Sequence, residues 1–313
     1  MRAVAFAEFG GPEVLTVADL PAPEPGPGEI RVRVAAATVN PTDTGMRSGS
    51  SAAVLRALAK PYVAGMELAG RVDAVGPGAA WKVGDAVLAI VLPTSTGRGA
   101  QAEQVVIPAD SAAAIPLSVD VVAAATLPMN GLTARRALDL MGLKRGQVLA
   151  VTGAAGAVGG YAMQLAVLDG LRVIAEAAPK DEALVRQLGA SDVVPRGPGA
   201  AAAIRKLVPD GVDGLVDTAL LGVRILAAVK DGGHMAVVRG FEFEGEPERG
   251  ITIDRVRVSD YAHNQAALAG LARLAGEGKL TLRVAEQFRP EAAAEAHRRL
   301  AAGGTRGRLV IVF

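Results

Sequence analysis

The sequence predicts an α/β protein in which a β-rich part is combined with a doubly wound parallel sheet. In the first third, short apolar stretches are separated by Gly, Pro and Asp, as in a β-barrel or sandwich. From about residue 118, strand and helix patterns alternate, which is typical of a parallel sheet. The chain has 313 residues, of which 50% are hydrophobic and 21% charged. This length and composition indicate a globular protein of about two domains.

The β-rich part is defined by apolar residues that alternate or cluster at strand spacing. We expect strands at residues 2–6, 30–35, 68–75, 86–92 and 102–107. The segment 21–28, which lies between the first two, is rich in proline and glycine. Because proline fits neither a helix interior nor a central strand, this segment is expected to form a surface turn.

Beyond Leu117 the pattern changes to helices and strands in alternation. We expect helices at residues 119–125 and 132–141 before the alternation begins. The expected strands are 148–152, 173–175, 192–194, 214–217, 234–238 and 251–256. The expected helices between them are 158–168, 181–188, 200–207 and 222–229. The tail is expected to form helices at 264–276 and 290–302 and a closing strand at 308–312.

Composition excludes several classes of function. Lys and Arg total 33 and Asp and Glu total 32, so the basic excess or stripe of a nucleic-acid binder is missing. The sequence contains no cysteine, which excludes disulfides, thiolate catalysis, Cys-ligated zinc and iron–sulfur clusters. The longest charge-free run, residues 146–168, is interrupted by glycines and fits a strand, a turn and a helix better than a membrane span. We therefore expect a cytoplasmic protein without nucleic-acid or membrane partners.

The most informative segment is a glycine-rich turn at residues 153–159, between an apolar strand and an apolar helix. It matches G-x-G-x-x-G with Ala154 in the first position, Gly156 in the second and Gly159 in the third. Backbone N–H groups at such a helix start hold a pyrophosphate, the second glycine allows close approach, and the third lets the helix pack on the strand. The turn predicts a dinucleotide site formed by Ala154, Gly156, Ala157, Val158 and Gly159; plain helix–sheet packing is the alternative.

Residues after the second strand of this unit bear on the choice between NAD and NADP. Glu176 lies 17 residues beyond Gly159, near the acidic position that hydrogen-bonds a ribose 2′-hydroxyl and repels a 2′-phosphate. Lys180 and Arg196 follow and offer the cations that a 2′-phosphate needs. All three can equally be surface charges. The residues alone leave the choice of cofactor open.

Many ordered motifs along the chain resemble one known family. Its matching stretches are Glu29-Ile-Arg-Val-Arg-Val34, Val39-Asn-Pro-Thr-Asp43, Gly65-Met-Glu-Leu-Ala-Gly70, Thr126-Leu-Pro-Met-Asn-Gly-Leu-Thr-Ala134, the turn 154–159 and Gly307-Arg-Leu-Val310. The sequence resembles the zinc-independent quinone oxidoreductases, the ζ-crystallin branch of the medium-chain dehydrogenase/reductase superfamily. The resemblance implies a GroES-like catalytic domain from residues 1–117 and 259–313, with a Rossmann domain at 118–258. It also implies a homodimer.

The resemblance implies a zinc-free hydride transfer. In the related zinc-dependent alcohol dehydrogenases, the metal ligands fall at positions that match Asn40, Met66 and Met129, which offer neither thiolate nor imidazole. The family places the substrate near Asn40, Asp43 and Thr133. Without zinc, the developing charge on a carbonyl oxygen needs hydrogen-bond donors, which the Asn40 amide and the Thr133 hydroxyl can provide. Asp43 is either a proton relay or a capping carboxylate.

We therefore expect an NAD(P)H-dependent reductase that passes hydride to a quinone or an α,β-unsaturated carbonyl. The alternatives are an enoyl-thioester reductase and, in another class, a nucleotide-binding structural or sensor protein with little turnover. Members of the family usually use NADPH, so the resemblance favours NADPH, with NADH possible. If the alignment is shifted by a one-residue gap, Glu176 points away from the ribose, and Lys180 and Arg196 face the 2′-phosphate. Departures from the family pattern at Ser51, Arg135 and residues 219–222 affect the expected substrate and nicotinamide contacts.

Overall fold

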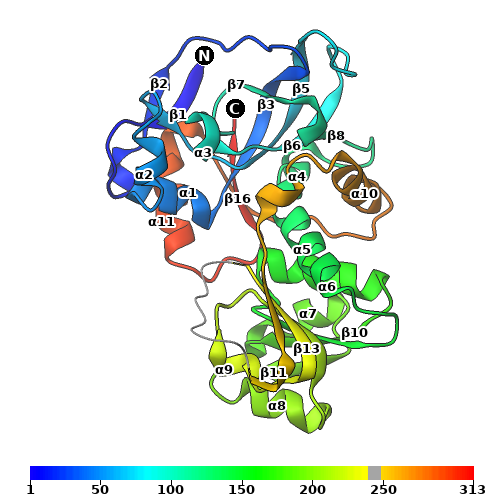
Figure 1. Cartoon of the computed structure of the whole chain (residues 1–313). Helices are drawn as coiled ribbons and strands as arrows, with labels where there is room; N and C mark the ends of the chain where they lie inside the picture. Colours follow the sequence, from blue (N-terminus) through cyan, green and yellow to red (C-terminus); the bar gives the residue numbers. More distant parts are fainter. Residues whose placement is uncertain (239–247) are drawn as a thin grey trace. The chain divides into compact units, whose positions relative to one another are not determined.

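A computed structural model describes residues 1–238 and 248–313 of the chain (Figure 1). The chain divides into two compact units: Met1–Met129 with Ser259–Phe313, and Asn130–Val258. Residues 118–129 belong to the first unit, whereas the sequence analysis placed them in the second. The short helix α4 (Val121–Ala124) packs on strands β3 and β5 of the first unit, which accounts for the difference.

The first unit is built around a largely antiparallel sheet that has seven strands in the described residues. Six of them run in the order β15-β16-β3-β5-β6-β8, and β7 pairs with β3. A smaller sheet has the order β2-β1-β4. The strands are β1 (Arg2–Phe6), β2 (Thr16–Asp19), β3 (Glu29–Val39), β4 (Tyr62–Val63), β5 (Glu67–Val75), β6 (Ala86–Ile90), β7 (Gln104–Pro108), β8 (Ala112–Ala114), β15 (Val284–Phe288) and β16 (Arg308–Val312).

Both ends of the chain contribute to this sheet. β16, close to the C-terminus, pairs antiparallel with β3, and Leu309 lies opposite Val39 (Figure 1). Ile30, Val32 and Val34 alternate toward one buried core, as the strand pattern predicts. The strand continues to Val39, beyond the predicted end at residue 35. The helices of the unit are α1 (Pro41–Ser48), α2 (Ala52–Leu55), α3 (Pro93–Thr96), α4, α10 (Gln265–Gly276) and α11 (Ala293–Ala301).

The second unit contains a parallel sheet of six strands in its described residues. The order is β11-β10-β9-β12-β13-β14, and every pair is parallel. The strands are β9 (Val148–Thr152), β10 (Arg172–Ala177), β11 (Asp192–Pro195), β12 (Val212–Asp217), β13 (Val229–Val237) and β14 (Thr252–Arg255). This is the 3-2-1-4-5-6 order of a Rossmann fold, whose direction reverses between β9 and β12. The α/β class expected from the sequence is confirmed.

Two helices of the second unit differ from the predicted ranges by more than one residue at an end. The helices are α5 (Pro128–Met141), α6 (Ala157–Leu168), α7 (Glu182–Gln187), α8 (Ala200–Leu207) and α9 (Val223–Leu226). α5 begins four residues before the predicted start at 132, because proline is tolerated in a first helical turn. The helix predicted at 222–229 is reduced to α9, since Val229 already pairs with Val212 in the sheet.

Short 3-10 helices join several of these elements. They cover Pro12–Val14, Ala109–Ser111, Pro179–Asp181, Glu248–Gly250, Val258–Tyr261 and Pro290–Ala292. No helix within the described residues is both long enough and apolar enough to cross a lipid bilayer.

Candidate functional site

The glycine turn joins β9 to α6 and depends on glycine for its shape. Gly156 is the N-cap of α6, with extended backbone angles (φ −71°, ψ 179°). A Cβ atom on Gly159 would lie 2.6 Å from the carbonyl oxygen of Gly153 and 2.9 Å from the Cα of Ala154. Any side chain there would push α6 off the turn. Gly153 itself adopts a left-handed conformation (φ 59°).

This turn has the properties that a dinucleotide pyrophosphate requires. It lies at the carboxyl end of β9, beside β12, where the strand order reverses and ligands of such sheets bind. The first N–H groups of α6 have no partner within the helix, and the helix dipole is positive at this end. The predicted binding residues, Ala154, Gly156, Ala157, Val158 and Gly159, all belong to this turn or the first helical turn. The residues present therefore fit a dinucleotide.

A hydrogen-bonded lock that the sequence analysis did not identify holds the neighbouring loop in place. Thr152 donates its hydroxyl to the buried Asp217 carboxylate at 2.6 Å, and Thr218 donates its hydroxyl to the Thr152 carbonyl oxygen at 2.6 Å. The Ala219 N–H donates to Thr152 Oγ1 at 3.1 Å, and the Gly222 N–H donates to Asp217 Oδ2 at 2.8 Å. In the sequence, the feature that could have indicated this network is Asp217, an aspartate at the end of the predicted strand 214–217. The lock fixes residues 218–222, the segment that departs from the family pattern.

Glu176 is directed into the glycine turn. Its side chain is 1% exposed, and Oε2 accepts a hydrogen bond from the Gly153 N–H at 2.8 Å. Its backbone carbonyl accepts from the Ala154 N–H at 3.2 Å. Oε1 has no hydrogen-bond partner among residues 1–238 and 248–313. The carboxylate therefore braces the turn.

Lys180 and Arg196 lie beyond the carboxyl ends of two adjacent strands. β10 and β11 are parallel neighbours, with Ala177 opposite Pro195, and the Arg196 N–H donates to the Ala177 carbonyl at 3.1 Å. Both basic side chains are exposed. The two cations are thus presented at the same edge of the sheet as the glycine turn.

A buried polar cluster occupies the first unit where β3, β5 and β16 meet. Thr38, Asn40 and Glu67 are fully buried, and Arg308 is 5% exposed. Arg308 Nη2 lies 2.7 Å from Thr38 Oγ1, 2.6 Å from Asn40 Oδ1 and 2.7 Å from Glu67 Oε1. Glu67 and Arg308 therefore form a buried ion pair, in which each charge compensates the other.

The Asn40 amide is held on both sides by this cluster. Its oxygen accepts from Arg308, and its Nδ2 lies 3.1 Å from Thr38 Oγ1 and 3.4 Å from Glu67 Oε1. The sequence analysis singled out Asn40 but missed Thr38, Glu67 and Arg308. No local pattern links residues 241 positions apart, as Glu67 and Arg308 are.

Asp43 has the geometry of a capping carboxylate. One oxygen accepts from the Asn40 N–H at 2.7 Å, which forms the capping box of α1, and the other accepts from the Gly65 N–H at 3.0 Å. Burial raises the pKa of Asp43 to about 7, although both hydrogen bonds and the charge of Arg308 act to lower it. Of the two roles considered from the sequence, the structure displays capping. Its pKa near neutrality also suits the proton relay.

The remaining residues singled out from the sequence occupy varied environments. Thr133 lies on α5 with 6% of its surface exposed. Ser51 is the N-cap residue of α2. Leu220, in the segment that departs from the family pattern, has a left-handed backbone (φ 58°) and is 41% exposed.

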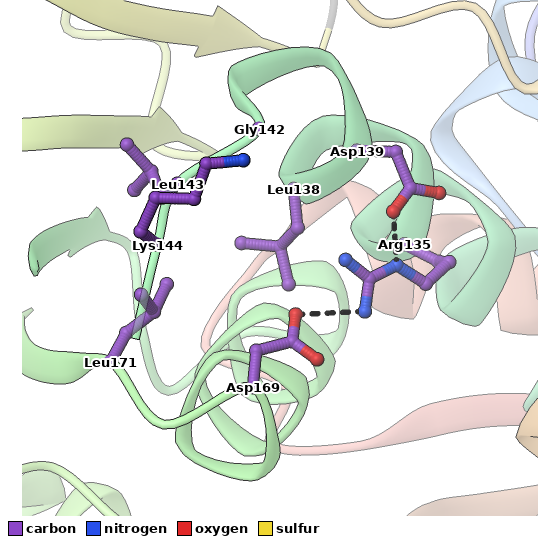
Figure 2. A pocket seen from close by; sticks show the side chains of 8 residues that line it. All are labelled: Arg135, Leu138, Asp139, Gly142, Leu143, Lys144, Asp169 and Leu171. Atoms are coloured by element: carbon purple, nitrogen blue, oxygen red, sulfur yellow. Dashed lines mark hydrogen bonds and ion pairs between the residues drawn. The ribbon is translucent and has the colours of Figure 1, made fainter. Parts of the chain in front are cut away.

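Arg135 serves packing within the second unit. Its guanidinium forms ion pairs with Asp139 at 2.8 Å and with Asp169 at 2.9 Å (Figure 2). Asp169 is the C-cap of α6, where a negative charge is unfavourable beside the helix dipole, so Arg135 offsets it. Both of these ion pairs therefore stabilise the packing of α5 and α6.

The hollow of about 570 Å³ beside Arg135 is not the dinucleotide site. Leu143 and Lys144 line it just before β9, and Leu171 lines it just before β10 (Figure 2). It therefore lies at the amino ends of these strands, whereas the glycine turn follows the carboxyl end of β9. Dinucleotides bind at the carboxyl ends.

The donor set does not fit a catalytic zinc ion. Of the three matching positions, Asn40 already gives its oxygen to Arg308, and the other two are the thioethers Met66 and Met129. Zinc in proteins prefers thiolate, imidazole and carboxylate ligands. Across the described part of the chain, no group of three or more His, Asp or Glu side chains is placed to share one metal ion.

Two family models match the sequence. The alcohol dehydrogenase GroES-like domain matches residues 26–117, and a domain described as zinc-binding dehydrogenase matches residues 188–311. The quinone oxidoreductase of Pongo abelii is 32% identical over 334 aligned positions, which cover 100% of this chain and 98% of the relative. The quinone oxidoreductase of Homo sapiens is 31% identical with the same coverage.

Solved structures match over the whole chain. The quinone oxidoreductase from Coxiella burnetii is 28% identical with a TM-score of 0.89, covering 100% of this chain and 99% of its own. An NAD-dependent alcohol dehydrogenase is 33% identical (TM-score 0.88), and a mycobacterial protein complexed with NADPH is 30% identical (TM-score 0.86); each match covers 100% of both chains. The enoyl reductase CurK, at 22% identity and a TM-score of 0.86, shares the fold.

Proposed function

Because the chain belongs to the quinone oxidoreductases of the medium-chain dehydrogenase/reductase superfamily, we propose that it reduces a quinone or an α,β-unsaturated carbonyl with NADPH and without zinc. The protein is an NAD(P)H-dependent reductase of that superfamily. The observation that carries the proposal is the glycine turn at the carboxyl end of β9, locked against residues 218–222. When bound, the nicotinamide cofactor supplies the hydride, and the chain's residues bind and orient the reactants.

The preference for NADPH over NADH rests on three side chains. Glu176 is buried against the Gly153 N–H. Lys180 and Arg196 are exposed beyond β10 and β11, whose carboxyl ends lie next to the turn. We assign these two cations to the 2′-phosphate. Among the similar solved structures, one is described as an NAD-dependent enzyme and another is complexed with NADPH. The proposed preference for NADPH therefore depends on the three residues named above.

At the substrate end, Thr133 and Asn40 are assigned as the donors to the substrate carbonyl oxygen. The bond from Asn40 Nδ2 to Glu67 Oε1 is long, at 3.4 Å, and is the bond that would yield to a substrate oxygen. Arg308 keeps the amide oriented, because it holds Asn40 Oδ1 at 2.6 Å. Reduction also consumes a proton, and Asp43, with its pKa of about 7, is the assigned relay.

We also propose that the protein is a cytoplasmic homodimer. Light scattering on the purified chain measures its mass directly, and a mass of one chain would contradict the dimer. Fractionation of the host cells tests the location.

Cofactor oxidation with a panel of acceptors tests the proposed reaction. Loss of nicotinamide absorbance is followed with a benzoquinone, a simple enone and an enoyl thioester, each with NADPH and with NADH. Turnover of the quinone or enone supports the proposal. Preference for the enoyl thioester would indicate the alternative reductase, and tight NADPH binding without turnover of any acceptor would indicate a non-catalytic nucleotide-binding protein.

A further inference from the structure

A second hollow, of about 410 Å³, lies on the large sheet of the first unit and has no part in the proposed reaction. Its walls come from β3, β5 and β6, from the segment between β8 and α4, and from Phe313. Along β3 its lining runs from Arg33 to Ala35, which lies five positions before Asn40. At about 3.3 Å per residue this is about 17 Å of strand, and Asn40 and the charged pair of Glu67 and Arg308 are not among the residues that line the hollow.

Two arginines stand directly opposite each other at this hollow. The strand register places Arg33 of β3 against Arg71 of β5, so both side chains lie on the same face of the sheet. Like charges in direct cross-strand positions destabilise a sheet unless an anion accompanies them. Both arginines line the hollow.

The chain compensates these charges only in part. Arg33 Nη2 lies 3.3 Å from Asp73, and Arg31, which shares that carboxylate at 2.7 Å, has a second partner in Glu24 at 2.8 Å. Arg71 donates to the Gly84 carbonyl at 3.0 Å, and in the described residues no aspartate or glutamate comes within 4.0 Å of it. Two carboxylates thus match Arg31 and Arg33, and Arg71 is the arginine that retains its positive charge beside the hollow.

The rest of the lining is apolar. Ala86 continues the cross-strand row from Arg71, and Ile115, Leu117 and Phe313 add larger side chains. Leu117, which lines the hollow, is fully exposed to solvent, so a ligand bound there would remove apolar surface from water. Concave sites that combine an apolar lining with a few charged groups are typical of small-molecule binding.

We propose that this hollow binds a small amphiphile with an anionic head group. The head, a carboxylate or a phosphate, pairs with Arg71 and Arg33, and arginine suits both because its planar guanidinium donates two parallel hydrogen bonds. The short apolar tail lies against Ile115, Leu117 and Phe313. The site is independent of the proposed reaction and does not require its substrate.

Calorimetry on the full chain saturated with NADPH tests the head-group contact. Octanoate and octyl phosphate are the probes, with octanol and acetate as the matched ligands that lack the charge or the tail. We expect at least one anionic amphiphile to bind more tightly than both matched ligands. Arg71→Ala should weaken it at least about ten-fold, the loss expected for one charge-assisted hydrogen bond. Lys82→Ala removes the same charge from an exposed position outside the hollow and should leave binding unchanged.

The absence of cysteine from the sequence allows the site to be located directly. Ala86→Cys places the only thiol inside the hollow, and Val83→Cys places it on an exposed position nearby, 68% exposed in the native residue. The bound amphiphile should slow alkylation of Ala86→Cys and not of Val83→Cys. Failure of both anionic amphiphiles to bind, equal affinity in Arg71→Ala, or equal alkylation rates with and without ligand at Ala86→Cys would each overturn the proposal. Binding of only one of the two supports the site and identifies its head group.

Discussion

At the scale of single residues, Gly159 shows how steric demand fixes the cofactor site. A Cβ atom would meet the Gly153 carbonyl oxygen at 2.6 Å, and backbone cannot move aside as a flexible side chain can. We expect Gly159→Ala to destabilise the protein by about 1–3 kcal/mol and to weaken NADPH binding. Thermal unfolding and calorimetry measure both. Gly270→Ala is the matched control: it lies in α10 with nothing within 4 Å and should stabilise slightly.

Cofactor selectivity is also decided by single residues. If Lys180 contacts the 2′-phosphate, Lys180→Ala removes one charge-assisted hydrogen bond of about 1.5–3 kcal/mol from NADPH and none from NADH. The dissociation constant of NADPH should rise about ten-fold or more, and that of NADH should hardly change. Lys206→Ala, on α8, is the control for net charge. A wild-type preference for NADH that shifts toward NADPH in Glu176→Ala would show instead that Glu176 reads the ribose.

Asp43 links a local cap to the proposed proton transfer. Asp43→Asn keeps the size of the side chain but can accept through only one oxygen, so one of the two backbone hydrogen bonds is lost. We expect a loss of stability of about 1 kcal/mol. If Asp43 relays the proton, the turnover rate of the wild type should change near pH 7 and this change should vanish in the variant. A pH profile that is the same in both proteins would leave Asp43 with its capping role alone.

At the scale of elements, α11 carries an acid-sensitive residue into the core. His297 is fully buried, and burial together with the nearby charge of Arg47 lowers its pKa to about 4. Above pH about 6.5 the histidine is neutral in both folded and unfolded chains. As the pH falls from 6.5 to 4, only the unfolded chain takes up the proton, so stability is lost, by up to about 3 kcal/mol.

The variant His297→Leu isolates this contribution. Asp43, whose pKa is raised, acts in the opposite direction, because the stability it provides at low pH is lost as the pH rises from 3.8 to about 7. Asp43 is present in both proteins, so its contribution cancels when the unfolding free energy of the wild type is subtracted from that of His297→Leu. It should grow in favour of the variant as the pH falls through this range, as denaturant titrations can measure. A difference that does not vary with pH would contradict the assignment.

At the scale of the whole chain, the ion pair of Glu67 and Arg308 joins segments 241 residues apart. Removing one partner leaves a buried charge uncompensated, which costs about 3–5 kcal/mol. We expect that loss for Arg308→Met and for Glu67→Leu. The double variant should be more stable than the sum of the two losses predicts. Denaturant unfolding of all four proteins measures the coupling, and strictly additive losses would show that the pair is not a unit.

The sequence by itself determined the features whose causes lie within a few residues. The glycine turn at 153–159 is readable because strand, turn and helix follow one another, and the need for Gly159 is a local steric fact. The α/β class followed from short-range apolar periodicity in the same way. The helix α1 escaped prediction, since its residues carry no apolar period and a capping box between Asn40 and Asp43 initiates it.

Only the tertiary structure decided where the long-range partners lie. It directed Glu176 onto the Gly153 N–H, placed Asp217 against Thr152, and brought Arg308 to Asn40. It also set Arg33 opposite Arg71 through the register of β3 on β5. The physical reason is that a hydrogen bond or an ion pair depends on atoms a few ångströms apart, and for residues distant along the chain that separation is set by strand order and register, which no local pattern encodes.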